Sequence, residues 1–65
     1  MHEYAILRFF VTEHLPDHLA EISEPFGELA RSIAAELPVS AEVSAALRKL
    51  LEAKDCAVRA LVAST

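Results

Sequence analysis

The chain has 65 residues and a formal net charge of −4, which argues against binding of DNA or long RNA through a basic surface. Its single cysteine, Cys56, excludes a disulfide within the chain and fits a reducing compartment. The N-terminal sequence has no signal-peptide pattern, and no apolar run approaches the ~20 residues that span a bilayer. We therefore expect a cytoplasmic protein without membrane contact.

The N-terminal arm holds three of the four aromatic residues, namely Tyr4, Phe9 and Phe10. Its apolar residues are so closely spaced that their period does not distinguish a short helix from an extended segment. Because such an arm exposes a large apolar surface in water, we expect it to pack across the helices or onto a neighbouring subunit.

The first helix is predicted to begin near Pro16, a residue that suits the first helical position, and Asp17 favours the positive end of the helix dipole. Apolar residues then recur every three or four positions, as on one helix face: Leu19, Ile22, Phe26, Leu29, Ile33 and Leu37. The period continues through Pro25, which favours one kinked helix. The alternative is two helices, the second capped by Ser23 or Glu24.

The second and longest helix is predicted after a turn that contains Pro38, and the hydroxyl of Ser40 can cap its first turn. Apolar residues again follow a helical period: Val43, Leu47, Leu50, Ala57 and Leu61. Lys54 occupies the one position of this row where an apolar residue is expected. Its ammonium therefore needs Asp55, another carboxylate or a ligand phosphate as a partner, or its stem extends to the rim.

A turn of a few residues makes two helices antiparallel neighbours. The sequence thus predicts an all-α fold, an antiparallel helical hairpin with the first helix kinked at Pro25 and a short N-terminal arm. We expect one domain over residues 1–65, with the arm at 1–15 and helices at 16–36 and 40–62. Since 54% of the residues are hydrophobic and so short a chain is marginally stable alone, we also expect a homo-oligomer.

No arrangement of residues predicts catalysis, a cofactor or a metal site. The chain has one Gly, which excludes a Gly-rich phosphate loop, and no nucleophile motif with its base is present. His14 and His18 have the i, i+4 spacing of metal ligands, but Pro16 between them places His14 outside the helix. We therefore expect that the protein is not an enzyme.

The charged residues of both helices have a plain interpretation as surface groups. Arg48–Glu52 and Asp55–Arg59 have the i, i+4 spacing of ion pairs on a helix. The carboxylates of the first helix are interpreted as its solvated face, and they are Glu21, Glu24 and Glu28.

Several segments share their pattern with a group of small phage proteins. They are Phe10 through His14-Leu15-Pro16, then Phe26-Gly27-Glu28-Leu29-Ala30, Leu37-Pro38, and Ala46-Leu47-Arg48-Lys49-Leu50-Leu51-Glu52-Ala53-Lys54-Asp55-Cys56-Ala57-Val58-Arg59-Ala60. In these segments the chain resembles short members, from phages of actinobacteria, of the phage hairpin-domain family of anti-CBASS and anti-Thoeris sponge proteins. The run from Ala46 to Ala60 is the most specific part of the resemblance.

The resemblance implies a helical hairpin in a higher oligomer, often a hexamer, with ligand pockets between subunits. It also implies binding of cyclic oligonucleotide messengers of bacterial defence, without cleavage, so that the messenger does not reach its effector. We therefore expect cyclic di- or trinucleotides as ligands. The alternatives are a small helical phage module that binds another protein, and a structural helical oligomer without a ligand.

The positions that match the family's motifs imply ligand contacts at His14, Pro16, Arg48 and Lys49. Chemistry alone adds Arg8, Phe10 and Arg59. An arginine fork donates paired hydrogen bonds to phosphate, and an aromatic ring stacks on a base. In a symmetric oligomer, arginines from several subunits can meet at one axis, which suits a ligand with repeated phosphates.

Overall fold

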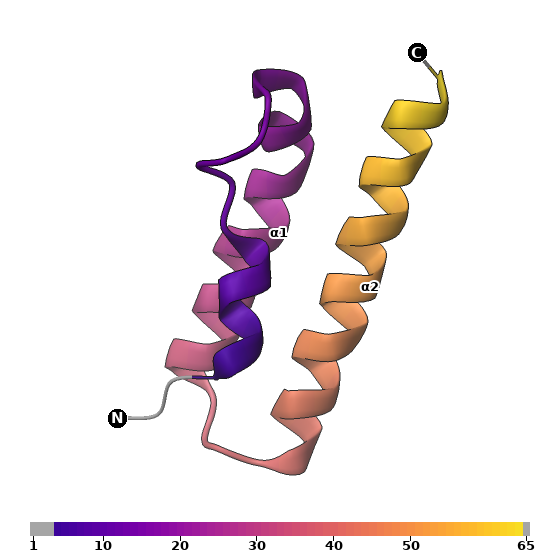
Figure 1. Cartoon of the computed structure of the whole chain (residues 1–65). Coiled ribbons are helices and arrows are strands. Elements are labelled where there is room, and N and C mark those ends of the chain that lie inside the picture. Colours follow the sequence, from indigo (N-terminus) through magenta and orange to yellow (C-terminus); the bar gives the residue numbers. More distant parts are fainter. Residues whose placement is uncertain (1–3, 65) are drawn as a thin grey trace.

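The computed structural model describes residues 4–64, and every regular element in this range is helical. A short 3₁₀ helix, η1 (Ala5–Phe10), precedes the two long helices α1 (Asp17–Glu36) and α2 (Ala41–Ser64). The long helices pack against each other and run in opposite directions (Figure 1). The predicted all-α class with two long packed helices is confirmed. Residues 1–3 of the predicted arm and Thr65 lie outside the described residues.

Residues at the helix ends explain where the long helices begin. The carbonyl oxygen of Pro16 accepts hydrogen bonds from the N–H groups of Leu19 and Ala20, at 3.0 and 2.9 Å. Ser40 Oγ accepts a hydrogen bond from the N–H of Val43 at 3.2 Å, which is the predicted cap of α2. The helices differ from the predicted ranges 16–36 and 40–62 by one residue at each start and by two residues at the end of α2.

Pro25 lies inside α1, and the helix continues on both sides of it. A proline within a helix removes one backbone donor and crowds the carbonyl of the residue four positions earlier, here Glu21. The bend predicted at Pro25 stays a prediction.

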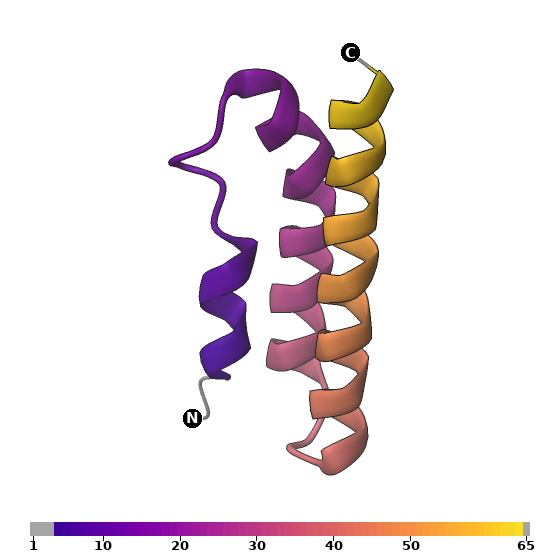
Figure 2. The ribbon, with the colours of Figure 1, turned by 45° about the vertical axis from the view of Figure 1, so that its right-hand side comes forward.

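The N-terminal arm packs on one side of the α1–α2 pair (Figure 2). Phe10, at the end of η1, is 1% exposed and contributes to the core. A Cβ atom at Gly27 of α1 would lie 3.1 Å from the carbonyl oxygen of Phe10, so the missing side chain leaves room for η1. Of the two conformations that the sequence left open, the structure has the short helix.

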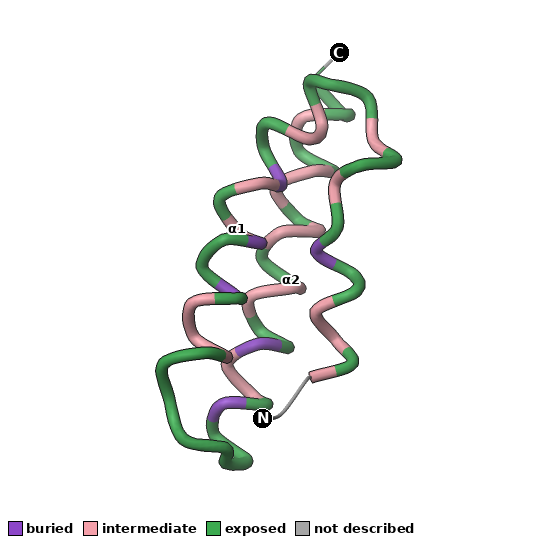
Figure 3. Tube along the Cα trace, turned by 90° about the vertical axis from the view of Figure 1, so that its left-hand side faces the viewer, coloured by how far each residue is buried: buried purple, intermediate pink, exposed green. Residues whose placement is uncertain are grey.

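The core is small for a chain with so many apolar residues. Buried positions recur at intervals along α1 and α2 and at the end of η1 (Figure 3). The buried apolar residues are Phe10, Ala30, Val43 and Leu47. Large apolar side chains that stay exposed are Phe9, Val11, Ile22, Leu29, Leu37, Val39 and Val62. An oligomer would bury part of this uncovered surface, and the oligomer itself stays a prediction.

Lys54 has the partner that the sequence suggested first. Its Nζ lies 2.9 Å from Oδ1 of Asp55, and its side chain is 14% exposed. The stem therefore fills the gap in the apolar row, while the ammonium meets a carboxylate at the rim. Within residues 4–64, no helix is both long and apolar enough to cross a membrane.

Candidate functional site

Three of the four arginines of the chain line grooves around η1. The first groove, which we call the η1–α1 groove, has a volume of about 600 Å³. Its walls combine two arginines with apolar residues and are formed by Tyr4, Ala5, Leu7, Arg8, Val11 and Arg31. Arg8 comes from η1 and Arg31 from α1, so the packing of η1 on α1 brings the two arginines to one groove.

A second groove, the turn groove, adjoins the first at Leu7 and Arg31, which line both. It has a volume of about 510 Å³, and its other walls are almost entirely apolar, being Ala34, Ala35, Leu37, Pro38 and Val39. Arg31 therefore lies between a groove with a second arginine and a groove with apolar walls.

A third groove, the η1–α2 groove, contains Arg48 on the other side of η1. It has a volume of about 240 Å³ and is lined by Tyr4, Ala5, Ile6, Ser44 and Arg48. Tyr4 and Ala5 also line the η1–α1 groove, so Tyr4 and the first residue of η1 separate Arg48 from Arg8 and Arg31. The hydroxyl of Tyr4 is buried there and has no hydrogen-bond partner in the part of the chain that the structure describes.

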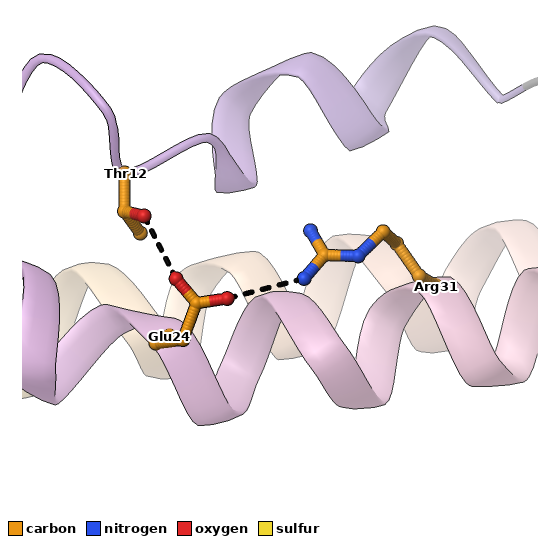
Figure 4. Close-up of polar contacts among 3 residues, drawn as sticks. All are labelled: Thr12, Glu24 and Arg31. Carbon is orange, nitrogen blue, oxygen red and sulfur yellow. Dashed lines mark hydrogen bonds and ion pairs between the residues drawn. The ribbon is translucent and has the colours of Figure 1, made fainter.

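Glu24 holds Arg31 in place and also fixes the segment that leads into α1 (Figure 4). Its Oε1 lies 3.3 Å from Nη2 of Arg31, and its Oε2 accepts a hydrogen bond from Thr12 Oγ1 at 2.8 Å. The side chain of Glu24 is 46% exposed, in line with its interpretation as part of a solvated face, and the packing of the arm also gives this carboxylate two partners. Arg31 Nη1 also lies over Gly27, where a Cβ atom would be 3.2 Å away.

Arg8 stacks on the neighbouring ring of Phe9, with Cζ 4.9 Å from the ring centroid. Phe9 was not among the predicted site residues, and its ring is exposed. A guanidinium over an aromatic face keeps its N–H edges available for an anion.

The structure brings together only some of the predicted site residues. Arg8 and Arg48 lie on either side of the start of η1, and Phe10 is buried in the core. His14 and Pro16 are exposed and precede α1, which begins at the end of the molecule where α2 ends (Figure 1). The remaining two, Lys49 and Arg59, are exposed on α2 and do not line the three grooves.

The predicted ion pairs on α2 do not form. Within residues 4–64 the ion pairs are Glu24–Arg31 and Lys54–Asp55, so Arg48 has no acidic partner in this range. Arg59 instead donates to Sγ of the exposed Cys56 at 3.3 Å. The same range contains no group of three or more His, Cys, Asp or Glu side chains that could hold a metal ion.

Sequence reasoning missed Arg31 and Tyr4 as members of this site. One signal was present, because Gly27 and Arg31 are four residues apart and share a flank of α1. A glycine within an otherwise regular helix often marks a close approach of another segment. The arm was the available segment, and Arg31 lies beside its point of contact.

Together the grooves provide the two kinds of contact that a small organic anion needs. Arginine edges bind phosphate or carboxylate oxygens in pairs, and the apolar walls accept a flat, poorly hydrated group. Comparisons of this chain with models of protein families, with curated proteins and with solved structures find no match. The family resemblance therefore stays a prediction that rests on the motifs of the sequence.

Proposed function

We propose that the protein binds and sequesters cyclic oligonucleotide messengers, cyclic di- or trinucleotides, without cleaving them. In this proposal it is a phage sponge in the cytoplasm of an infected bacterium and blocks a CBASS-like defence. The observation that carries the proposal is the position of Arg31, between the η1–α1 groove with Arg8 and the apolar turn groove.

The chemistry of a cyclic oligonucleotide fits these adjoining grooves. Its phosphates lie a short distance from flat bases, and the grooves place arginines next to apolar walls. The volumes of about 600 and 510 Å³ fall in the range of roughly 300–1,000 Å³ that is typical of small-molecule sites. Phe9 does not line these grooves, but its exposed ring lies against Arg8, and a base that stacks on such a ring gains about 1–3 kcal/mol.

The charge of the chain supports a small ligand over DNA or long RNA. The net charge is −4, yet Arg8, Arg31 and Arg48 gather around one short helix. A long polyanion would approach many carboxylates beyond this cluster, whereas a cyclic dinucleotide at Arg31 would meet one, Glu24.

We further propose that the protomer is an antiparallel hairpin bent at Pro25 and that copies assemble into a homo-oligomer. The hexamer is the form that the resemblance implies. The exposed apolar residues Ile22 and Leu29 of α1 support assembly, because a monomer would leave them in water.

A second candidate is a small interaction module that binds another protein and no nucleotide. The exposed apolar residues Leu37 and Val39 of the turn groove favour this alternative. Such docking would depend on apolar contacts, so substitutions of the arginines distinguish the two functions.

The test is recovery of intact ligand. The purified protein is mixed with a panel of cyclic di- and trinucleotides, freed of unbound ligand and denatured by heat, and the released compounds are identified by mass spectrometry. We expect one class of cyclic nucleotide to be released intact from the wild type and about tenfold less from Arg31→Ala. The matched arginine control, Arg59→Ala, should retain the wild-type amount. Release of linear products, or of nothing from the wild type, would contradict the proposal.

A further inference from the structure

Two exposed apolar residues of α1 point away from η1. Gly27 marks the side of α1 that faces η1, because a Cβ atom there would meet Phe10. Successive residues of an α-helix are rotated by about 100°, so Ile22 and Leu29 lie about 140° and 160° from Gly27. Leu29 is 51% exposed, and Ile22 is also exposed. The α1–α2 pair therefore has an apolar ridge on the side opposite the arm.

On the same side, α2 presents a row of alanines. Arg48 marks the side of α2 that faces η1, since it lines the η1–α2 groove. At about 100° per residue, Ala46, Ala53 and Ala60 lie about 160°, 140° and 120° from Arg48. We call the ridge and this row together the back face, made up of Ile22, Leu29, Ala46, Ala53 and Ala60.

We infer that two copies of the chain pack back face to back face about a two-fold axis parallel to the long helices. This inference rests on the homo-oligomer of the proposed function and names the surface through which two of its subunits meet. Because this axis is parallel to the helices, the turns of both copies lie at the same end of the dimer. Each α1 then packs over α2 of the other copy, and residues that are equally far from their turns face each other.

The ridge of one copy fits the alanine row of the other in this arrangement. Leu29 lies seven residues before the last residue of α1, Glu36. The position seven residues after the first residue of α2, Ala41, is position 48, so Leu29 faces the part of the other α2 between Ala46 and Ala53. Ile22 is fourteen residues from that end and corresponds to position 55, between Ala53 and Ala60. Each bulky side chain therefore meets a gap between two methyl groups, as in close helix packing.

Charges at the rim of the back face complement each other under the same symmetry. Glu28 is eight residues before the end of α1, and Lys49 is eight residues after the start of α2. Both are exposed, and neither has an ion-pair partner within residues 4–64 of its own chain. The two-fold axis brings Glu28 of each copy beside Lys49 of the other, so the pair forms twice.

The size of the face is adequate for a stable dimer. The Cα atoms extend over 40 × 19 × 15 Å, so a face along the helices measures at most about 40 by 19 Å before side chains are added. Stable complexes bury about 800 Å² on each partner, which is comparable. One two-fold axis brings the ridge onto the alanine row and Glu28 beside Lys49. Because the face complements itself in this way, we favour a second copy of the chain over an unrelated protein as its partner.

The first test changes the centre of the face. In sedimentation velocity, the wild type should contain an even number of subunits, and Leu29→Glu should reduce that number by at least half, because it places a charge in the contact. Val62→Glu is the matched control, since Val62 is 54% exposed and lies nine residues, or about 180°, from Ala53. Circular dichroism should give the same helix content for all three proteins. An unchanged subunit number in Leu29→Glu would overturn the inference.

The second test exchanges the rim charges. Glu28→Lys and Lys49→Glu should each raise the dissociation constant of the dimer about tenfold, because both copies of the pair become repulsive. The double variant should return to within about threefold of the wild type. A double variant that dissociates as readily as the single variants would overturn the proposed axis.

Ligand binding is measured separately, so that the two proposals can fail separately. A wild-type protein of even subunit number that retains no cyclic nucleotide supports the pairing and removes the proposed function. A monomer that retains a cyclic nucleotide removes the pairing and leaves the function.

Discussion

Glu24 competes for Arg31, because Oε1 of its carboxylate lies 3.3 Å from Nη2 of the guanidinium. The other carboxylate oxygen accepts the hydrogen bond from Thr12, so the same side chain also holds the segment before α1. Both members of the pair are about half exposed, which makes the pair weak and replaceable by a stronger anion. Arg31 is thus positioned at the groove while a ligand can still displace its partner.

Glu24→Gln should strengthen the binding of a cyclic nucleotide several-fold. The amide oxygen can still accept the hydrogen bond from Thr12, but the charge that competes for Arg31 is removed. Isothermal titration calorimetry measures the change in dissociation constant. The control is Glu21→Gln, which removes the same charge from an exposed position of the same helix, away from the grooves and outside the proposed Glu28–Lys49 pair. Equal effects of the two substitutions would mean that only net charge matters.

Arg48→Ala should weaken ligand retention about tenfold and leave the subunit number unchanged. Arg48 is exposed, lines the η1–α2 groove and has no ion-pair partner within residues 4–64. Its loss therefore removes a cation without exposing core. Native mass spectrometry reports retention and subunit number in one spectrum. Disassembly of the oligomer by this substitution would identify Arg48 as a structural residue instead.

Gly27→Leu should destabilise the protein by about 1–3 kcal/mol, the usual range for overpacking. Even a Cβ atom at Gly27 would lie 3.1 Å from the backbone oxygen of Phe10, so a larger side chain must displace η1. Urea denaturation followed by circular dichroism gives the free energy of unfolding. The control Glu21→Leu adds a similar side chain at an exposed position of the same helix and should change stability by less than about 0.5 kcal/mol.

Ser23→Ala should stabilise the protein by about 0.5–1 kcal/mol. Ser23 is 2% exposed, and its hydroxyl has no hydrogen-bond partner within the described residues. Removal of a buried, unpaired hydroxyl from the middle of a helix relieves a desolvation cost and raises helix propensity. Thermal unfolding of both proteins measures the difference, and a lower melting temperature for Ser23→Ala would show that the hydroxyl has a partner.

The long helices could be predicted from the sequence because local signals fix them. Ser40 carries a capping hydroxyl, and the structure contains that bond to Val43. Pro16 and Pro38 stand just outside α1 and α2, so the ends follow from backbone chemistry alone. Lys54 interrupts the apolar row from Val43 to Leu61, so its ammonium was expected to need a carboxylate. The structure pairs it with Asp55.

The conformation of the arm and the grooves beside it could not be predicted in the same way. The arm is apolar at almost every position, so its sequence has no period that favours a 3₁₀ helix. Arg31 and Glu24 looked like ordinary surface residues of α1, and only the docking of η1 gives them roles. Phe10, chosen for its ring chemistry, is instead the largest buried side chain, because η1 ends over Gly27.

Native mass spectrometry of the wild-type protein with a panel of cyclic di- and trinucleotides shows whether paired protomers hold an intact cyclic messenger at the arginines around η1. We predict an assembly with an even number of subunits that carries unmodified ligand of one class. A monomer that carries no member of the panel would contradict the account.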